Sequence, residues 1–112
     1  MIVKQKDIIL LQYPFSNFEG NKVRPAIIVS NDELNKKSGD CIVVPLTTVI
    51  KDEPYSIIIN KEDLSSGSLI KQSRIRIDKI SAIEKNLIVM KIGTANDKIF
   101  NIIKHEISKL FL

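Results

Sequence analysis

The chain has 112 residues, enough for one domain with a modest core, and we expect residues 1–112 to form that single domain. Its 17 basic and 13 acidic residues leave a net charge of +4, a mild excess that suits RNA, DNA or an acidic peptide as partner. The single histidine and single cysteine nearly exclude the usual metal sites and the common Ser-His-Asp and Cys-His groups, so we expect no metal and no cofactor.

No apolar run reaches the length needed to span a membrane, and the N-terminus is too short and too polar before its first strand for a signal peptide. We therefore expect a cytoplasmic protein without membrane contact. Cys41 has no second cysteine to pair with and is followed by apolar residues, so we expect it to be a small buried side chain.

Seven short runs that are apolar or alternate with period two predict β-strands. The first, Asp7 to Tyr13, is apolar nearly throughout, so we expect it to be covered on both faces. The second begins with Pro25, and because a strand tolerates proline at its first residue, we expect pairing to start there. Strand lengths and spacing predict a small, strongly bent antiparallel sheet that closes on itself. The runs are 7–13, 25–30, 40–46, 55–59, 73–78, 80–83 and 87–90.

Polar connections separate these runs. Phe15 to Val23 is a loop of turn residues that also carries the aromatic Phe18. Asn31 to Gly39 has room for one helical turn, and Asn60 to Gly67 is expected to be a turn with a short helical piece.

The end of the chain predicts an amphipathic helix laid over the sheet. Thr94 to Asp97 has the form of an N-cap followed three residues later by an acid. Beyond it, apolar residues recur at helical spacing, with polar residues such as His105 between them, and we expect His105 on the surface. The apolar positions are Ile99, Phe100, Ile103, Ile107, Leu110 and Phe111.

Arg24 and Thr47 are the first candidates for a functional site. Arg24 precedes a proline, which holds its backbone extended, and its guanidinium matches a phosphate; the alternative is a structural ion pair with a nearby acid. Thr47 follows a core strand and either caps a loop or offers a hydroxyl donor. If the two strands are antiparallel neighbours, both residues lie at one edge of the sheet, ~5–10 Å apart.

The alternation in Ser73-Arg74-Ile75-Arg76 is the third candidate. Period two predicts a strand with one wet face, and two alternate arginines are most simply a solvated face. The alternative is a track for phosphates, helped by Lys71 and Lys79, in which Gln72 and Ser73 contact the bases or backbone of a nucleic acid.

Four segments follow one another along the chain in one recognisable pattern. They are Asp7-Ile8-Ile9-Leu10 with Pro14-Phe15, the Arg-Pro strand from Val23 to Ser30, Pro45-Leu46-Thr47, and the segment from Leu69 to Ile80. Together they resemble the PemK/MazF family of toxins. The resemblance covers the whole chain in order, including its length and its terminal helix. Unlike many members, this chain has Lys6 rather than glycine before Asp7, and Thr47-Thr48-Val49 lacks the polar residue often seen soon after the threonine that matches Thr47.

The resemblance implies a mainly β fold with a C-terminal α-helix, the small SH3-like barrel that these toxins share with CcdB gyrase poisons. It implies the toxin of a type II toxin-antitoxin system: a metal-independent, sequence-selective endoribonuclease that cuts single-stranded RNA. A homodimer is implied as well. The usual partner is an antitoxin whose acidic, partly disordered tail lies across the RNA site.

The same resemblance assigns site residues. The family's catalytic arginine and threonine match Arg24 and Thr47, with Thr48 as the neighbour that could take the role. RNA cleavage without metal uses the 2′-hydroxyl as nucleophile, and Arg24 and Thr47 would stabilise the anionic transition state. Substrate contacts are expected from the following residues: Phe15, Asn17, Lys22, Pro25, Thr48, Gln72, Ser73 and Arg76.

Two other functions stay open. A CcdB-like gyrase inhibitor would share the fold, but this chain ends in the apolar Leu110-Phe111-Leu112 and retains Arg24 and Thr47, which such binding does not need. A non-catalytic nucleic-acid or peptide-binding barrel would bind RNA with an affinity that falls with salt and would not cut it.

Overall fold

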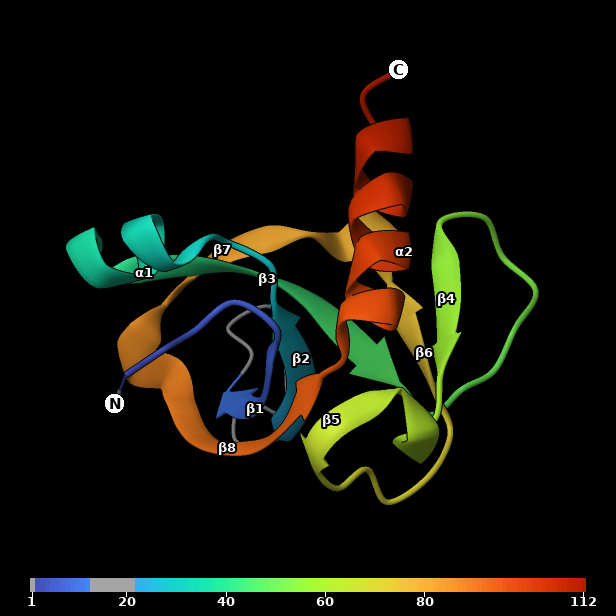
Figure 1. The fold of residues 1–112 in the computed structure, drawn as a ribbon, viewed down its shortest axis with the longest axis horizontal. Coiled ribbons are helices and arrows are strands. Elements are labelled where there is room, and N and C mark those ends of the chain that lie inside the picture. Colours follow the sequence, from blue (N-terminus) through green and yellow to red (C-terminus); the bar gives the residue numbers. More distant parts are fainter. Residues whose placement is uncertain (1, 13–21) are drawn as a thin grey trace.

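The structure, a computed structural model, describes residues 2–12 and 22–112 (Figure 1). Within them the chain is mainly β, with one long helix at its C-terminal end. None of the described helices is long and apolar enough to cross a membrane. In chain order the elements are β1 (Asp7–Gln12), β2 (Val23–Ile28), α1 (Asp32–Lys37), β3 (Asp40–Thr47), β4 (Ser56–Ile59), β5 (Leu64–Gly67), β6 (Ser73–Arg76), β7 (Ser81–Glu84), β8 (Ile88–Ala95) and α2 (Asp97–Lys109), with 3-10 turns at Lys61–Asp63, Ile77–Lys79 and Lys85–Leu87.

The strands form one curled antiparallel sheet in the order β4-β6-β3-β2-β1-β8-β5. β3 is the shared strand: Asp40 to Val43 pair with β7, while Leu46 and Thr47 pair with β6. The sheet curls, and α2 stands beside β4 and β6 (Figure 1). The expected bent antiparallel sheet with a C-terminal helix is confirmed.

Side chains on the two faces of the central strands enter two separate core clusters. Ile8 and Ile27 belong to the cluster that α2 covers with Ile99, Phe100 and Ile103. The residues next to Ile8 and Ile27 in β1 and β2 point to the opposite face and enter the second cluster. This cluster includes Ile9, Leu11, Ala26, Ile28, Cys41 and Val43. The strands read as continuous apolar runs because both faces are covered, which confirms the expectation for the first strand.

β2 begins at Val23, so the expectation that pairing starts at Pro25 is wrong. Val23 and Arg24 already pair with β1, and Pro25 lies opposite Leu10. The ladder to β3, by contrast, begins only at Ala26. Proline has no N–H to donate, and Pro25 lies directly before the residue at which the ladder to β3 starts.

Residues 60–67 were expected to form a turn, but their second half is a strand, β5, that pairs with β8. Gly67 makes this pairing possible, since its φ is 81° and a Cβ there would lie 2.3 Å from the Cα of Gly93. β8 is accordingly longer than expected and runs to Ala95. Two serines and a glycine carry no strand pattern, so β5 is explained by its backbone pairing with β8 and by the packing of Leu64 against the core.

Asn96 is the N-cap of α2, and its side chain accepts a hydrogen bond from the N–H of Ile99 (2.9 Å). Lys6 donates a hydrogen bond to the Asp97 carboxylate, which lowers the pKa of Asp97. The helix ends at Lys109, two residues before Phe111, whose side chain is exposed. The predicted helix is therefore confirmed, with a later start than the Thr94 cap and an earlier end.

Candidate active site

Three polar residues on neighbouring strands line up across the sheet. The β2–β3 ladder ends at the pair Ala26–Pro45, and its register, continued by two residues beyond that pair, would bring Arg24 opposite Thr47. Thr47 is paired with Arg74 of β6. Residues directly opposite each other in antiparallel strands point to the same face, and adjacent strands lie about 5 Å apart. We call this set the Arg24–Thr47–Arg74 row.

Arg24 is the exposed member of the row. Within the described residues its side chain takes part in neither an ion pair nor a hydrogen bond. The structural ion pair considered from the sequence is therefore not formed with any described residue. An exposed guanidinium remains charged at all physiological pH values and offers a planar set of donors to a phosphate.

Thr47 is half-buried and its hydroxyl is oriented. Its Oγ1 accepts a hydrogen bond from the backbone N–H of Val49 (3.2 Å). A hydroxyl has one hydrogen to donate besides its acceptor lone pairs, so this contact leaves the O–H of Thr47 available to a ligand. Thr48, the next residue, is exposed at the beginning of the loop that leads to β4.

Arg74 is buried, so the expectation of a wet face on β6 is wrong. Only 4% of Arg74 is exposed. Its Nε donates to the carbonyl of Val49 (3.1 Å) and its Nη1 donates to Oγ of Ser56 (2.9 Å), while Glu53 lies 3.8 Å away. The loop between β3 and β4 folds over this face and takes up the guanidinium. Arg74 therefore belongs to neither a solvated face nor a phosphate track.

Arg76, Lys22 and Pro25 lie around the row with differing access. Arg76 is half-buried: Nη2 donates to Asp78 (3.1 Å), and its buried Nε has no partner among the described residues. Lys22 is exposed just before β2, and Pro25 is half-buried within it. Lys71 and Lys79, the other members of the suggested track, are exposed.

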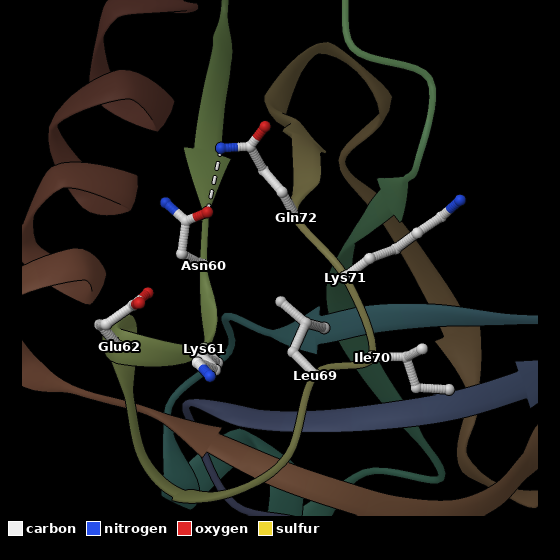
Figure 2. Close-up of a pocket in the computed structure, with 7 residues that line it drawn as sticks. All are labelled: Asn60, Lys61, Glu62, Leu69, Ile70, Lys71 and Gln72. Carbon is white, nitrogen blue, oxygen red and sulfur yellow. Dashed lines mark hydrogen bonds between the residues drawn. The ribbon is translucent and has the colours of Figure 1, made fainter.

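Gln72 and Ser73 point in different directions. Gln72 is exposed, and its Nε2 donates to Oδ1 of Asn60 (3.0 Å) across the mouth of an open pocket of about 260 Å³ (Figure 2). Residues 60–62 and 69–72 line this pocket. Ser73 is only 2% exposed and its hydroxyl donates to the carbonyl of Lys71 (3.1 Å), so the fold does not bring it to the surface with the others.

The remaining residues singled out from the sequence are Phe15, Asn17, His105 and Cys41. Phe15 and Asn17 lie outside the described residues. His105 is exposed on α2, as expected, and Cys41 is fully buried, where burial raises the pKa of its thiol to about 11. In the described part of the chain no group of histidine, cysteine and acidic residues could hold a metal ion.

Arg74 is the member of the row whose environment the sequence predicted wrongly. The alternation of polar and apolar residues correctly placed Arg74 on the same face of the strand as Arg76. That alternation carries no information on which loop covers the face. The one signal for a buried arginine would have been the apolar residues on either side, Ile75 and Ile77, and these are equally compatible with an exposed one.

Three solved structures with the same fold are distant from this chain in sequence. An endoribonuclease in complex with its cognate antitoxin, from a mycobacterial species, has a TM-score of 0.76 and 18% identity, over 97% of this chain and 94% of that chain. The toxin MazF-mt6 of Mycobacterium tuberculosis has a TM-score of 0.76 and 17% identity, over 94% and 95% of the two chains. A MazE-MazF crystal structure from Deinococcus radiodurans has a TM-score of 0.75 and 17% identity, over 99% and 96%.

No curated protein matches the chain significantly. A family model does: the PemK-like, MazF-like toxin of type II toxin-antitoxin systems matches residues 4–111, nearly the whole chain. The fold of the described residues agrees with this match, since its structural neighbours include MazF proteins. The chain therefore belongs to the PemK-like, MazF-like family of type II toxins.

Proposed function

We propose that the protein is the toxin of a type II toxin-antitoxin system and cuts single-stranded RNA without a metal ion. The proposal is supported by the positions of Arg24 and Thr47, which the β2–β3 register, continued beyond its last pair, brings to neighbouring places at one edge of the sheet. One is an exposed guanidinium with no partner among the described residues, and the other is an oriented hydroxyl with its hydrogen still to donate.

The proposed reaction is an attack of the RNA on itself. The 2′-oxygen forms a bond to the neighbouring phosphorus, the bond from phosphorus to the 5′-oxygen breaks, and the proton lost by the 2′-hydroxyl is matched by one gained by the leaving oxygen. The products are a 2′,3′-cyclic phosphate and a free 5′-hydroxyl. Negative charge grows on the non-bridging oxygens in the transition state.

Arg24 and Thr47 would act on that growing charge. The guanidinium would lie against the non-bridging oxygens, and the Thr47 hydroxyl would donate a hydrogen bond to one of them. A donor of this kind contributes about 3–4 kcal/mol to transition-state stabilisation. RNA contacts around the pair would come from Lys22, Pro25 and Thr48, and further contacts from Gln72 and Arg76. Phe15 and Asn17, which lie outside the described residues, are also proposed to contact the RNA. Ser73 would contact it through its backbone.

The proposed partners are an antitoxin and a second copy of the chain. Structural neighbours include an endoribonuclease with its cognate antitoxin and a MazE-MazF assembly, which supports an antitoxin here. An acidic antitoxin tail would suit the net charge of +4 and the exposed Arg24. Exposed apolar side chains on β8, Val89 and Met90, support a homodimer.

Cleavage of long RNA in EDTA tests the proposal. We expect the wild type to cut RNA of varied sequence at selected sites and to leave 5′-hydroxyl and cyclic phosphate ends. Arg24→Ala should lose at least about 100-fold in rate, because the phosphate charge is no longer neutralised, while its thermal unfolding stays unchanged.

Lys36→Ala is the matched control, since Lys36 is an exposed cation on α1, away from the row. It should cut RNA at the wild-type rate. Intact RNA after incubation with folded wild type, or cutting that requires Mg²⁺, would contradict the proposal. RNA affinity that falls with salt in the absence of cutting would point to the non-catalytic barrel instead.

A further inference from the structure

We propose that Arg74 is a positioning residue for Thr47: through the backbone of Val49 it holds the Thr47 hydroxyl so that its hydrogen faces the ligand. The inference rests on the proposed function, because it assigns Arg74 a part in the same cleavage site. It concerns a residue that does not itself reach the RNA, since only 4% of Arg74 is exposed.

One residue, Val49, connects the two side chains. Its carbonyl accepts the hydrogen bond from Nε of Arg74 (3.1 Å), and its N–H donates to Oγ1 of Thr47 (3.2 Å). Both groups flank the same Cα, so an arginine that holds the carbonyl also limits how far the N–H can turn. The direction of the remaining Thr47 hydrogen then follows from the lone pair that Val49 occupies.

Besides Arg74, a backbone hydrogen bond holds the far end of the loop from Thr48 to Tyr55, donated by the N–H of Ile77 to the carbonyl of Tyr55 (3.0 Å). The loop contains no helix or strand, and Val49 and Ile50 are both about half exposed, so it is not anchored by apolar burial. Its far end is unfavourable in itself, since Tyr55 has a φ of 56°. The residue that follows, Ser56, is the second acceptor of Arg74 (2.9 Å). One guanidinium therefore holds both ends of the loop.

The arginine depends on the loop in the same way. A guanidinium stays charged and carries five N–H donors, so its burial requires acceptors. The acceptors at hydrogen-bond distance, the carbonyl of Val49 and Oγ of Ser56, both come from the loop or its junction with β4. Glu53 lies further off, at 3.8 Å, and is half exposed. The neutral acceptors, more than the ion pair, therefore fix the position of Arg74.

The experiment compares two Arg74 variants with one control. Arg74→Met removes the donors, and Arg74→Lys keeps the charge but cannot bridge Val49 and Ser56 with a rigid fork. Glu53→Gln keeps both neutral acceptors and removes only the more distant charge. All variants are checked for folding by circular dichroism and thermal unfolding, and if Arg74→Met does not fold, Arg74→Lys carries the test.

The first readout needs no RNA. Three-bond NMR couplings report the χ1 rotamer of Thr47, and hydrogen exchange reports the Val49 amide. We expect one Thr47 rotamer and a protected amide in the wild type and in Glu53→Gln, and averaged couplings with faster exchange in both Arg74 variants. A single, unchanged rotamer in folded Arg74 variants would overturn the inference, whatever the protein does to RNA.

The second readout is single-turnover cleavage of RNA. Both Arg74 variants should lower the rate of the chemical step by about tenfold or more while KM stays within about twofold, because the hydrogen bond of Thr47 acts mainly in the transition state. Arg74→Met combined with Thr47→Val should be no slower than Thr47→Val alone. Additive losses would overturn the inference. Failure of the wild type to cut RNA would contradict the proposed function and leave the NMR result as the test of positioning.

Discussion

Exposure separates the three residues of the Arg24–Thr47–Arg74 row. Arg24 is exposed, Thr47 is half-buried with one lone pair occupied, and Arg74 is buried under the loop between β3 and β4. Two arginines on one face thus have different environments. The exposed one is suited to meet a phosphate, and the buried one is suited to hold protein atoms in place.

The hydroxyl of Thr47 can be tested apart from its methyl group. Thr47→Val should lower the cleavage rate by about 10²–10³-fold, because a donor aimed at the developing charge is lost. Single-turnover kinetics with mapped RNA ends measure the effect. Thr94→Val, at a half-buried threonine of β8 outside the row, is the control and should keep the wild-type rate. A larger loss in Thr48→Val than in Thr47→Val would move the catalytic role to Thr48.

Cys41 predicts how stability changes at high pH. Burial raises the pKa of its thiol from 9.0 to about 11, so the unfolded chain ionises first as the pH rises. This contribution to stability is complete below pH 9 and is lost as the pH passes through 11. Urea unfolding at pH 8 and pH 10 should show that the wild type loses roughly 1 kcal/mol more than Cys41→Ala over this interval. Parallel losses in the two proteins would contradict it.

At the scale of elements, the edge strand β5 shows how closely two backbones can approach. Gly67 and Gly93 face each other in the ladder with β8, and side chains at either position would collide with backbone atoms. The pairing brings the 3-10 turn at Lys61–Asp63 beside the start of α2, where Asn96 donates from its backbone N–H to the carbonyl of Asp63 (2.8 Å).

A methyl group at position 67 should therefore destabilise the sheet edge. Gly67→Ala combines a positive φ with a Cβ placed 2.3 Å from the Cα of Gly93 and from the carbonyl oxygen of Ile92, and we expect a loss of about 2–3 kcal/mol in urea unfolding. Gly39→Ala is the matched control, because no atom lies within 4 Å of its added Cβ, and it should change stability by about 0.5 kcal/mol or less. Equal stability of the two variants would show that β5 does not hold this geometry.

At the scale of the whole molecule, the row lies where the two-sided coverage of the central strands ends. Alternate residues of β2 and β3 enter either the cluster under α2 or the cluster with Cys41. Toward the start of β2 and the end of β3 this double coverage ends, and the polar row takes over the face of Ala26 and Ile28. Arg24 and Thr47 thereby stand on rigid strands. Because their backbones are already ordered, RNA binding would cost less conformational freedom of the protein.

The sequence by itself determined the elements whose signal is local. Period-two and apolar runs predicted most strands, helical spacing and an N-cap predicted α2, and the ordered motifs around Arg24-Pro25 and Thr47 indicated the family. The antiparallel pairing of those two strands was only assumed from the sequence, and the structure supplies it. The strand, helix and family signals all depend on residues close together in the chain or on motifs that keep their order.

Only the tertiary structure decided what depends on distant segments. Arg74 is buried because a loop about twenty residues earlier in the chain supplies its acceptors, and alternation cannot show which loop covers a face. β5 is a strand because β8 offers a backbone edge, and β2 starts at Val23 because β1 pairs with it there before β3 does. Hydrogen bonds and burial between remote segments outweigh weak local preferences, and they give the polar residues of the row their different environments.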